Sequence, residues 1–310
     1  MDGQTGRRLL GLFIMLAVVG CGDGGGSAPR GNGATYDQQV RQALGDRDLS
    51  RRALTLINIG DRRRAARDLS GAEDTFSLAR KACEAIEEPD QRAGMYGFLA
   101  RGYARAEMKS QGRKAAASAR SAADQVQGAE PQARALLRVG EAYAALQDRN
   151  QAVAALRDAE KLMPKIDEGK AQSVAKRSKV EILTVTASVY QQIGREEDVA
   201  DRLRRALETA QSIEKPRTRC DAIAIIASME KTLDRTGADE TFRLAVAAAG
   251  EIPEDVSQGH ALVNIAERRQ QAGQYQAATE LLAQAKSAAD KVKSRSLRNE
   301  LMDRIQKARQ

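Results

Sequence analysis

The sequence predicts an all-α protein, an αα-solenoid of about six helix-turn-helix repeats, and three observations lead to that fold class. The 310 residues are 42% hydrophobic but only 3% aromatic, without Trp, so Ala, Leu, Ile and Val must build the core. Such a composition suits closely packed helices. Long segments also recur at a fixed offset, and prolines and glycines divide apolar blocks that have helical spacing.

The repeat is visible as direct self-similarity. SAADQV at 121–126 recurs as SAADKV at 287–292, and GAEDTFSLARKACEAI at 71–86 recurs as GADETFRLAVAAAGEI at 237–252, both 166 residues apart. Recurrence at one offset indicates a repeat array. The unit is shorter than this offset, because similar segments close at spacings of 40, 40, 47, 39 and 40 residues on Ile86, Val126, Ile166, Ile213, Ile252 and Val292. We therefore expect a period of about 40 with one insertion near residues 167–179.

Prolines mark the junctions between units. The closing positions have a proline within a few residues at Pro89, Pro131, Pro164, Pro216 and Pro253, and proline is poorly tolerated inside a helix. Within a unit, two apolar blocks such as 183–193 and 198–213, with Gly194 between them, predict an αα-hairpin. One hairpin cannot bury both faces, so neighbouring units must stack. This repeat domain is expected at residues 36–293.

The unit resembles a tetratricopeptide repeat, whose pattern is W-x2-L-G-x2-Y, then A-x3-F, then P. The third unit carries Leu136, Val139, Gly140, Tyr143, Ala152, Leu156, Ala159 and Pro164. The fourth carries Leu183, Ala187, Tyr190, Gly194, Leu203 and Ala206, and the sixth carries Leu262, Ile265, Ala266, Gly273, Ala278, Leu282 and Ala285. In the first and fifth units the second helix matches, whereas the second unit matches least. The period is 40 rather than 34, so a HEAT-like or other αα-solenoid stays open.

The last residues predict a cap for the array. SRSLRNELMDRIQKAR at 294–309 places Leu297, Leu301 and Ile305 on one stripe of a helix with a polar back. Terminal repeats of solenoids need such a polar outer face for solubility. Residues 294–310 are therefore expected to form a capping helix.

The N-terminus is built like an export signal. Residues 1–20 combine Arg7 and Arg8 with an apolar stretch too short for a confident membrane span. Val18-Val19-Gly20-Cys21 resembles a bacterial lipobox, which implies lipidation of Cys21, a flexible Gly/Ser-rich tether at 21–35, and a body in the periplasm. Gly22 after the cysteine favours the outer membrane. The alternative is an ordinary signal peptide with a chance cysteine.

Several chemistries have no signal in the sequence. His260 is the only histidine, and there is no HExxH, closely spaced Cys pair or phosphate loop, so we expect no enzyme, metal site or cofactor. Cys83 and Cys220 lie four units apart and are expected to be small, partly buried hydrophobes. The net charge of +8 comes from 50 basic and 42 acidic residues that interleave, which with the export signal disfavours nucleic acid.

The resemblance also implies where a partner binds, because tetratricopeptide arrays hold extended peptides or helices in a concave groove lined by their first helices. Carried onto this chain, the resemblance places these residues in the groove: Arg64, Arg101, Arg105, Glu141, Gln191, Gln192, Glu230, Lys231, His260, Asn264 and Glu267. Asp61 of the first unit would lie there with Arg64. The arginines of the groove could clamp a carboxylate-rich segment, or could instead pair with nearby acids on a solvated face.

The resulting expectation is a lipid-anchored scaffold or adaptor of the bacterial cell envelope that binds an envelope protein or peptide. The alternative is a module that binds cell-wall glycan or another envelope component. A pulldown separates them, because a scaffold enriches a stoichiometric protein whereas a glycan binder sediments with purified cell wall.

Overall fold

The described part of the chain, residues 35–167 and 171–309 of a computed structural model, is helical without a strand. Its helices are α1 (Tyr36–Leu44), α2 (Leu49–Ala65), α3 (Leu69–Glu84), α4 (Pro89–Arg105), α5 (Lys109–Ala123), α6 (Ala129–Ala145), α7 (Arg149–Lys161), the 3₁₀ helix η1 (Met163–Asp167), α8 (Gln172–Gln192), α9 (Glu196–Gln211), α10 (Pro216–Thr232), α11 (Ala238–Gly250), α12 (Asp255–Gln271), α13 (Tyr275–Lys291) and α14 (Arg295–Ala308). The expected all-α class is confirmed. The predicted signal peptide, Cys21 and nearly all of the tether lie outside the described residues.

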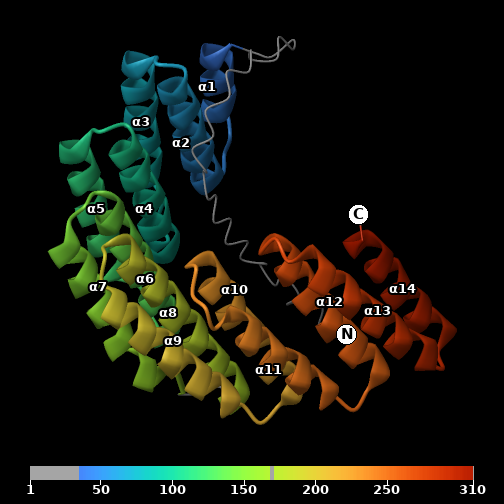
Figure 1. Ribbon diagram of the computed structural model, residues 1–310. Coiled ribbons are helices and arrows are strands. Elements are labelled where there is room, and N and C mark those ends of the chain that lie inside the picture. Colours follow the sequence, from blue (N-terminus) through green and yellow to red (C-terminus); the bar gives the residue numbers. More distant parts are fainter. Residues whose placement is uncertain (1–34, 168–170, 310) are drawn as a thin grey trace, which may run out of the picture. The chain divides into compact units, whose positions relative to one another are not determined.

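Consecutive helices pack as pairs, and each pair packs on the next (Figure 1). The closest packing joins α2 to α3, α4 to α5, α6 to α7, α8 to α9, α10 to α11 and α12 to α13. We call the first member of each pair a first helix and the other a second helix. Each first helix also contacts the first helix of the next pair, and each second helix contacts that same following first helix. This neighbour-only packing is that of a helical repeat solenoid.

The turn inside each pair has the same backbone geometry. The residue after the helix cap has a positive φ at Arg67, Glu107, Gln147, Gly194, Asp234 and Gly273. The next N–H then donates to a carbonyl five residues back, as from Asp148 to Tyr143 over 2.9 Å. This is the Schellman motif, which satisfies carbonyls at the end of a helix. Its positions are spaced 40, 40, 47, 40 and 39 residues, close to the spacing of the closing segments.

Helix starts follow the expected capping chemistry. Pro89 and Pro216 stand at the first positions of α4 and α10, where the missing N–H costs nothing. The carboxylates of Asp48, Asp68 and Asp148 accept N-terminal amide hydrogen bonds at α2, α3 and α7. The prolines thus begin first helices, in agreement with their predicted place at junctions.

Small residues allow the helices to approach closely. A Cβ added to Gly60 would lie 2.6 Å from the Phe76 ring, and one added to Gly140 would lie 2.9 Å from Leu156 Cδ2. The stacked alanines Ala72, Ala79, Ala152 and Ala159 have no exposed surface. The core therefore runs continuously through the pairs. All six closing residues of the repeat units, from Ile86 in the first unit to Val292 in the last, are buried.

The insertion lengthens a first helix. Between the third and fourth pairs, η1 follows α7, and α8 has 21 residues against 17 in the other first helices. Residues 168–170, within the expected insertion, lie outside the described part. The extra residues around 167–179 thus extend α8 at its N-terminal end.

The C-terminal helix packs on the last helix pair. α14 contacts both α12 and α13 and belongs to the same compact unit as the pairs. Leu301 and Ile305 are buried, whereas Leu297 keeps 45% exposure because it lies in the first turn of the helix. Leu301 packs directly on Gly259 of α12, where an added Cβ would lie 2.3 Å from Leu301 Cδ2.

Cys83 and Cys220 are free thiols without exposed surface. Burial raises the pKa of each thiol to about 12, so neither is a thiolate at neutral pH. The expectation of small hydrophobic roles agrees with this burial.

Candidate functional site

The first helices form one uninterrupted face. Contacts run in series from α2 through α4, α6, α8 and α10 to α12, and then to α14. Their exposed and half-buried side chains, which include all the predicted groove residues, define what we call the first-helix face. Neighbouring first helices are linked across this face by polar side chains, and these links decide which groups are available to a ligand.

The two arginines of the expected clamp are paired within the protein. Arg105 forms a two-pronged ion pair with Asp61 of α2, in which Nε lies 3.1 Å from Oδ1. Arg101 donates to Glu141 of α6 over 3.2 Å and lies over the Phe98 ring at 4.8 Å. Carboxylates from neighbouring helices thus already occupy these guanidinium groups, as expected for arginines that pair with nearby acids.

The Glu141 side chain is partly buried in this face. Its side chain is 29% exposed, yet burial raises the pKa of the carboxyl above its ordinary value, and Arg101 and Arg138 act in the opposite direction. Arg138 itself reaches across to Asp90 of α4 at 3.3 Å. Gly94 and Gly97 of α4 leave the room that the Arg138 side chain fills.

The charge links continue through the middle of the face. Arg134 of α6 lies 3.0 Å from Glu130 on its own helix and 2.5 Å from Glu181 of α8. Glu181 also pairs with Arg177 at 3.3 Å. Successive first helices are therefore joined by alternating charges.

Three predicted site residues at the C-terminal end are held by the capping helix. Arg304 of α14 donates to Asn264 Oδ1 at 2.5 Å and to Glu267 Oε2 at 3.1 Å, and lies 3.4 Å from His260 Nδ1. A guanidinium can only donate, so in this contact Nδ1 accepts and His260 is neutral with its proton on Nε2. His260, Asn264 and Glu267 thus come together, but around α14.

Other predicted residues keep unused hydrogen-bonding capacity. Gln192 and Lys231 are exposed. Among the described residues, Arg64 Nε, Gln191 Oε1 and Glu230 Oε2 are buried atoms without a hydrogen-bond partner. Burial raises the pKa of Glu230, although a hydrogen bond from Thr241 and the charge of Arg235 act against this. These groups lie on α2, α8 and α10, so the structure does not gather them at one point.

Sequence reasoning missed Arg268. It occupies the place on α12 where α2 also has an arginine, Arg62, and where the other first helices have Gly102, Ala142, Val189 and Met229. Burial lowers its pKa, which Asp221, Glu181 and Glu267 oppose and Arg177 reinforces. Within residues 35–167 and 171–309 it makes no side-chain hydrogen bond or ion pair. An arginine at a repeat position that is small or apolar in four of the six first helices was the signal that could have revealed it.

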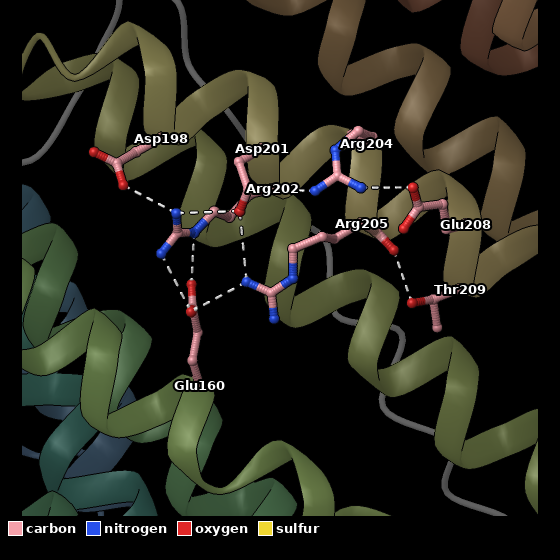
Figure 2. Close-up of polar contacts among 8 residues, drawn as sticks. All are labelled: Glu160, Asp198, Asp201, Arg202, Arg204, Arg205, Glu208 and Thr209. Atoms are coloured by element: carbon pink, nitrogen blue, oxygen red, sulfur yellow. Dashed lines mark hydrogen bonds and ion pairs between the residues drawn. The ribbon is translucent and has the colours of Figure 1, made fainter.

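A second network joins second helices at the insertion. Figure 2 shows Glu160 of α7 facing Arg202 and Arg205 of α9, at 2.9 Å and 3.6 Å. Arg202 also pairs with Asp198, and its guanidinium lies over the ring of buried Tyr190 at 4.8 Å. This network ties the third pair to the fourth on the side of the second helices.

The described residues offer neither a metal centre nor a membrane span. No group of three His, Cys, Asp or Glu side chains within them is arranged to hold a metal ion. No described helix is long and apolar enough to cross a bilayer.

Comparisons with known proteins add no family. No family model matches the chain, and no curated protein matches it. Among solved structures, it matches the crystal structure of Ton1535 from Thermococcus onnurineus NA1 at 16% identity, over 87% of this chain and 83% of that one, with a TM-score of 0.35. A TM-score this low supports no inference about this chain.

Proposed function

We propose that this chain is a lipid-anchored scaffold of the bacterial cell envelope, built from about six tetratricopeptide-like repeats of about 40 residues and closed by α14. A partner segment binds along the first-helix face. Cys21 carries the lipid, the outer membrane is the favoured location, and the body lies in the periplasm. The lipobox resemblance supports the proposed anchor. The recurring segments and turns support the proposed repeats.

One observation carries the binding role: the first helices contact one another in series without a gap. Such a face spans several pairs, so it suits an extended polypeptide better than a compact small molecule. Its central stretch on α8 and α10 carries Gln191, Gln192 and Lys231, and half-buried Ser188 and Ser228 lie on the same two helices. Extended segments have many backbone donors and acceptors, which amides and hydroxyls can match.

Site-specific photo-crosslinking in cells tests this proposal. A photoreactive side chain at Lys231, on the first-helix face, should yield one discrete protein adduct, and the matched position Lys286 on second helix α13 should not. Gln192→Arg places a larger, charged side chain on α8, next to α10. It should prevent the partner segment from binding across these two helices and so remove the adduct at Lys231. Adducts that are identical from both positions would contradict a role for this face, and sedimentation with purified cell wall in place of an adduct would favour the glycan-binding alternative.

The anchor is tested in the same cells. A palmitate analogue should label the wild type and leave Cys21→Ala unlabelled, and only the wild type should float with membranes. Equal absence of label in both would remove the lipid from the proposal while the crosslinking result still decides the scaffold.

A further inference from the structure

The second helices differ sharply in charge, and α5 and α7 stand apart. Together these two helices carry seven basic and two acidic side chains. By contrast, α3, α9, α11 and α13 each carry at least as many acidic as basic side chains. We propose that α5 and α7 form a docking surface for an anionic phospholipid bilayer. The surface, called here the cationic patch, consists of Lys109, Arg113, Lys114, Arg149 and Arg157.

All five side chains of the patch are exposed. On α5, Gly112, Ala116 and Ala119 are buried, whereas Arg113 and Lys114 are exposed away from them and Lys109 is exposed at the first position of the helix. Arg157 is exposed on the side of α7 away from buried Ala152 and Ala159, and Arg149 is exposed at the first position of that helix, beside Gly194. Lys109 and Arg149 occupy equivalent positions 40 residues apart, because each lies two residues after the positive-φ residue of its turn.

An ion pair places the two helices side by side. Arg120 of α5 lies 2.7 Å from Asp158 of α7. That pair, together with the bond from Lys161 to Asp158, neutralises one of the two carboxylates of α7. The remaining acid of α7, Glu160, is turned toward α9 (Figure 2).

The patch cations are not neutralised inside the described protein. None of the five forms an ion pair or side-chain hydrogen bond within residues 35–167 and 171–309. The contrast with α9 is direct, because Arg202, Arg204 and Arg205 each face carboxylates in Figure 2. The arginines of α9 are neutralised by carboxylates of the protein, whereas the patch cations of α5 and α7 are available to an external anion.

The chemistry of the patch fits a bilayer surface. It consists of flexible cations over a base of alanines, without an aromatic side chain on α5 or α7, and so lacks the stacking platform typical of single-stranded nucleic acid sites. Cations spread over adjacent helices suit the diffuse negative potential of anionic headgroups. The proposed lipid at Cys21 adds reach, since 14 residues separate it from Tyr36 and a stretch of that length spans at most about 50 Å. The patch cations attract anionic headgroups with or without that lipid.

Vesicle binding of the full chain tests the proposal. Partition is measured into phosphatidylcholine vesicles and into phosphatidylcholine vesicles containing phosphatidylglycerol, at low and high salt. Any binding through the apolar N-terminal segment is common to both kinds of vesicle, so the ratio of the two affinities reports the patch. The wild type should favour the anionic vesicles by at least about tenfold at low salt, and high salt should abolish the preference because it screens exposed charges.

A triple variant and a matched control locate the effect. Each cation near an anionic surface contributes about a fivefold factor, so Lys109→Gln, Arg113→Gln and Lys114→Gln together should lower the ratio by at least about tenfold. Arg204→Gln, Arg243→Gln and Lys286→Gln remove the same charge from α9, α11 and α13, where each cation is paired with a carboxylate. This control should leave the ratio unchanged.

Three outcomes would overturn the proposal: no anionic preference in the wild type, an equal loss in the control, or patch-dependent binding to polyglutamate without binding to vesicles. Binding to polyglutamate alone would mean that the patch binds an acidic protein instead of a bilayer. Circular dichroism of each variant establishes that it is folded. The result is independent of crosslinking from the first-helix face, so either proposal can fail alone.

Discussion

Single residues at the helix turns show what local sequence signals can and cannot reveal. Gly194 and Gly273 have φ values of 71° and 75°, a conformation that glycine adopts without strain, and the sequence predicted the turn at Gly194. Arg67, Glu107, Gln147 and Asp234 adopt the same conformation although their side chains disfavour it. Only the regular spacing of the repeat indicates those turns.

Gln147→Gly should therefore stabilise the protein. Gln147 has a φ of 61° in the turn between α6 and α7, and glycine there relieves a backbone cost of about 1 kcal/mol. Urea unfolding should show a gain of about that size in free energy of unfolding. Gly194→Ala is the reverse control and should lose a similar amount. A loss in Gln147→Gly would mean that the Gln147 side chain contributes more than its backbone costs.

The side-chain links of the first-helix face were only half predictable. Arg101 and Glu141 were both predicted as face residues, and they lie 40 residues apart, one period of the repeat. Periodicity therefore places such residues on neighbouring helices. It does not say that the arginine turns toward the carboxylate instead of toward a ligand, because that depends on packing around Phe98 and on the depth of Glu141.

At the scale of elements, α14 was predicted as a cap from the stripe Leu297, Leu301 and Ile305. The sequence could not show that its polar side reaches His260, Asn264 and Glu267 through Arg304. Its partner residues on α12 were found through the repeat register, whereas α14 itself lies beyond the last complete pair. The contact joins a predicted cap to a predicted groove and makes the docking of α14 sensitive to charge.

The only histidine of the chain gives this contact a direct pH readout. Burial, Arg304 and Arg217 lower the pKa of His260 below its ordinary 6.5, against a small opposing effect of Glu300. The folded protein then binds fewer protons than the unfolded chain just below pH 6.5, so stability rises with pH through that window and is lost on acidification. Protonated His260 loses its acceptor nitrogen and repels Arg304, which should loosen α14.

NMR titration of the His260 ring should accordingly give a pKa below 6.5, and Arg304→Met should raise it by removing the nearest cation. Arg295→Met, on the exposed first turn of α14, is the matched control and should leave the pKa unchanged. In unfolding experiments, His260→Asn should flatten the pH dependence below 6.5. A wild-type pKa at or above 6.5 would contradict the packing of His260 against Arg304.

For the molecule as a whole, contacts that reach only neighbouring pairs have a thermodynamic consequence. In such arrays, stability is a sum of local terms, and a weakened unit can open without the distant ones. The sequence predicted this architecture because composition, periodicity and proline placement agree. It could not predict that the additional residues extend α8, since helix and loop insertions look alike at residues 167–179.

Two equivalent phenylalanines provide the test. Phe76 and Phe242 lie 166 residues apart in the recurring segments, and both are fully buried. Phe76→Leu leaves a gap beside Gly60 and Tyr103 and should cost on the order of 1 kcal/mol. Hydrogen exchange should become faster in α2 to α4 while α10 to α13 keep their protection. Phe242→Leu, beneath the Arg269 guanidinium, should give the opposite map. Equal acceleration throughout either variant would instead mean that the pairs unfold as one cooperative body, with stacking between first helices strong enough to couple both ends of the array.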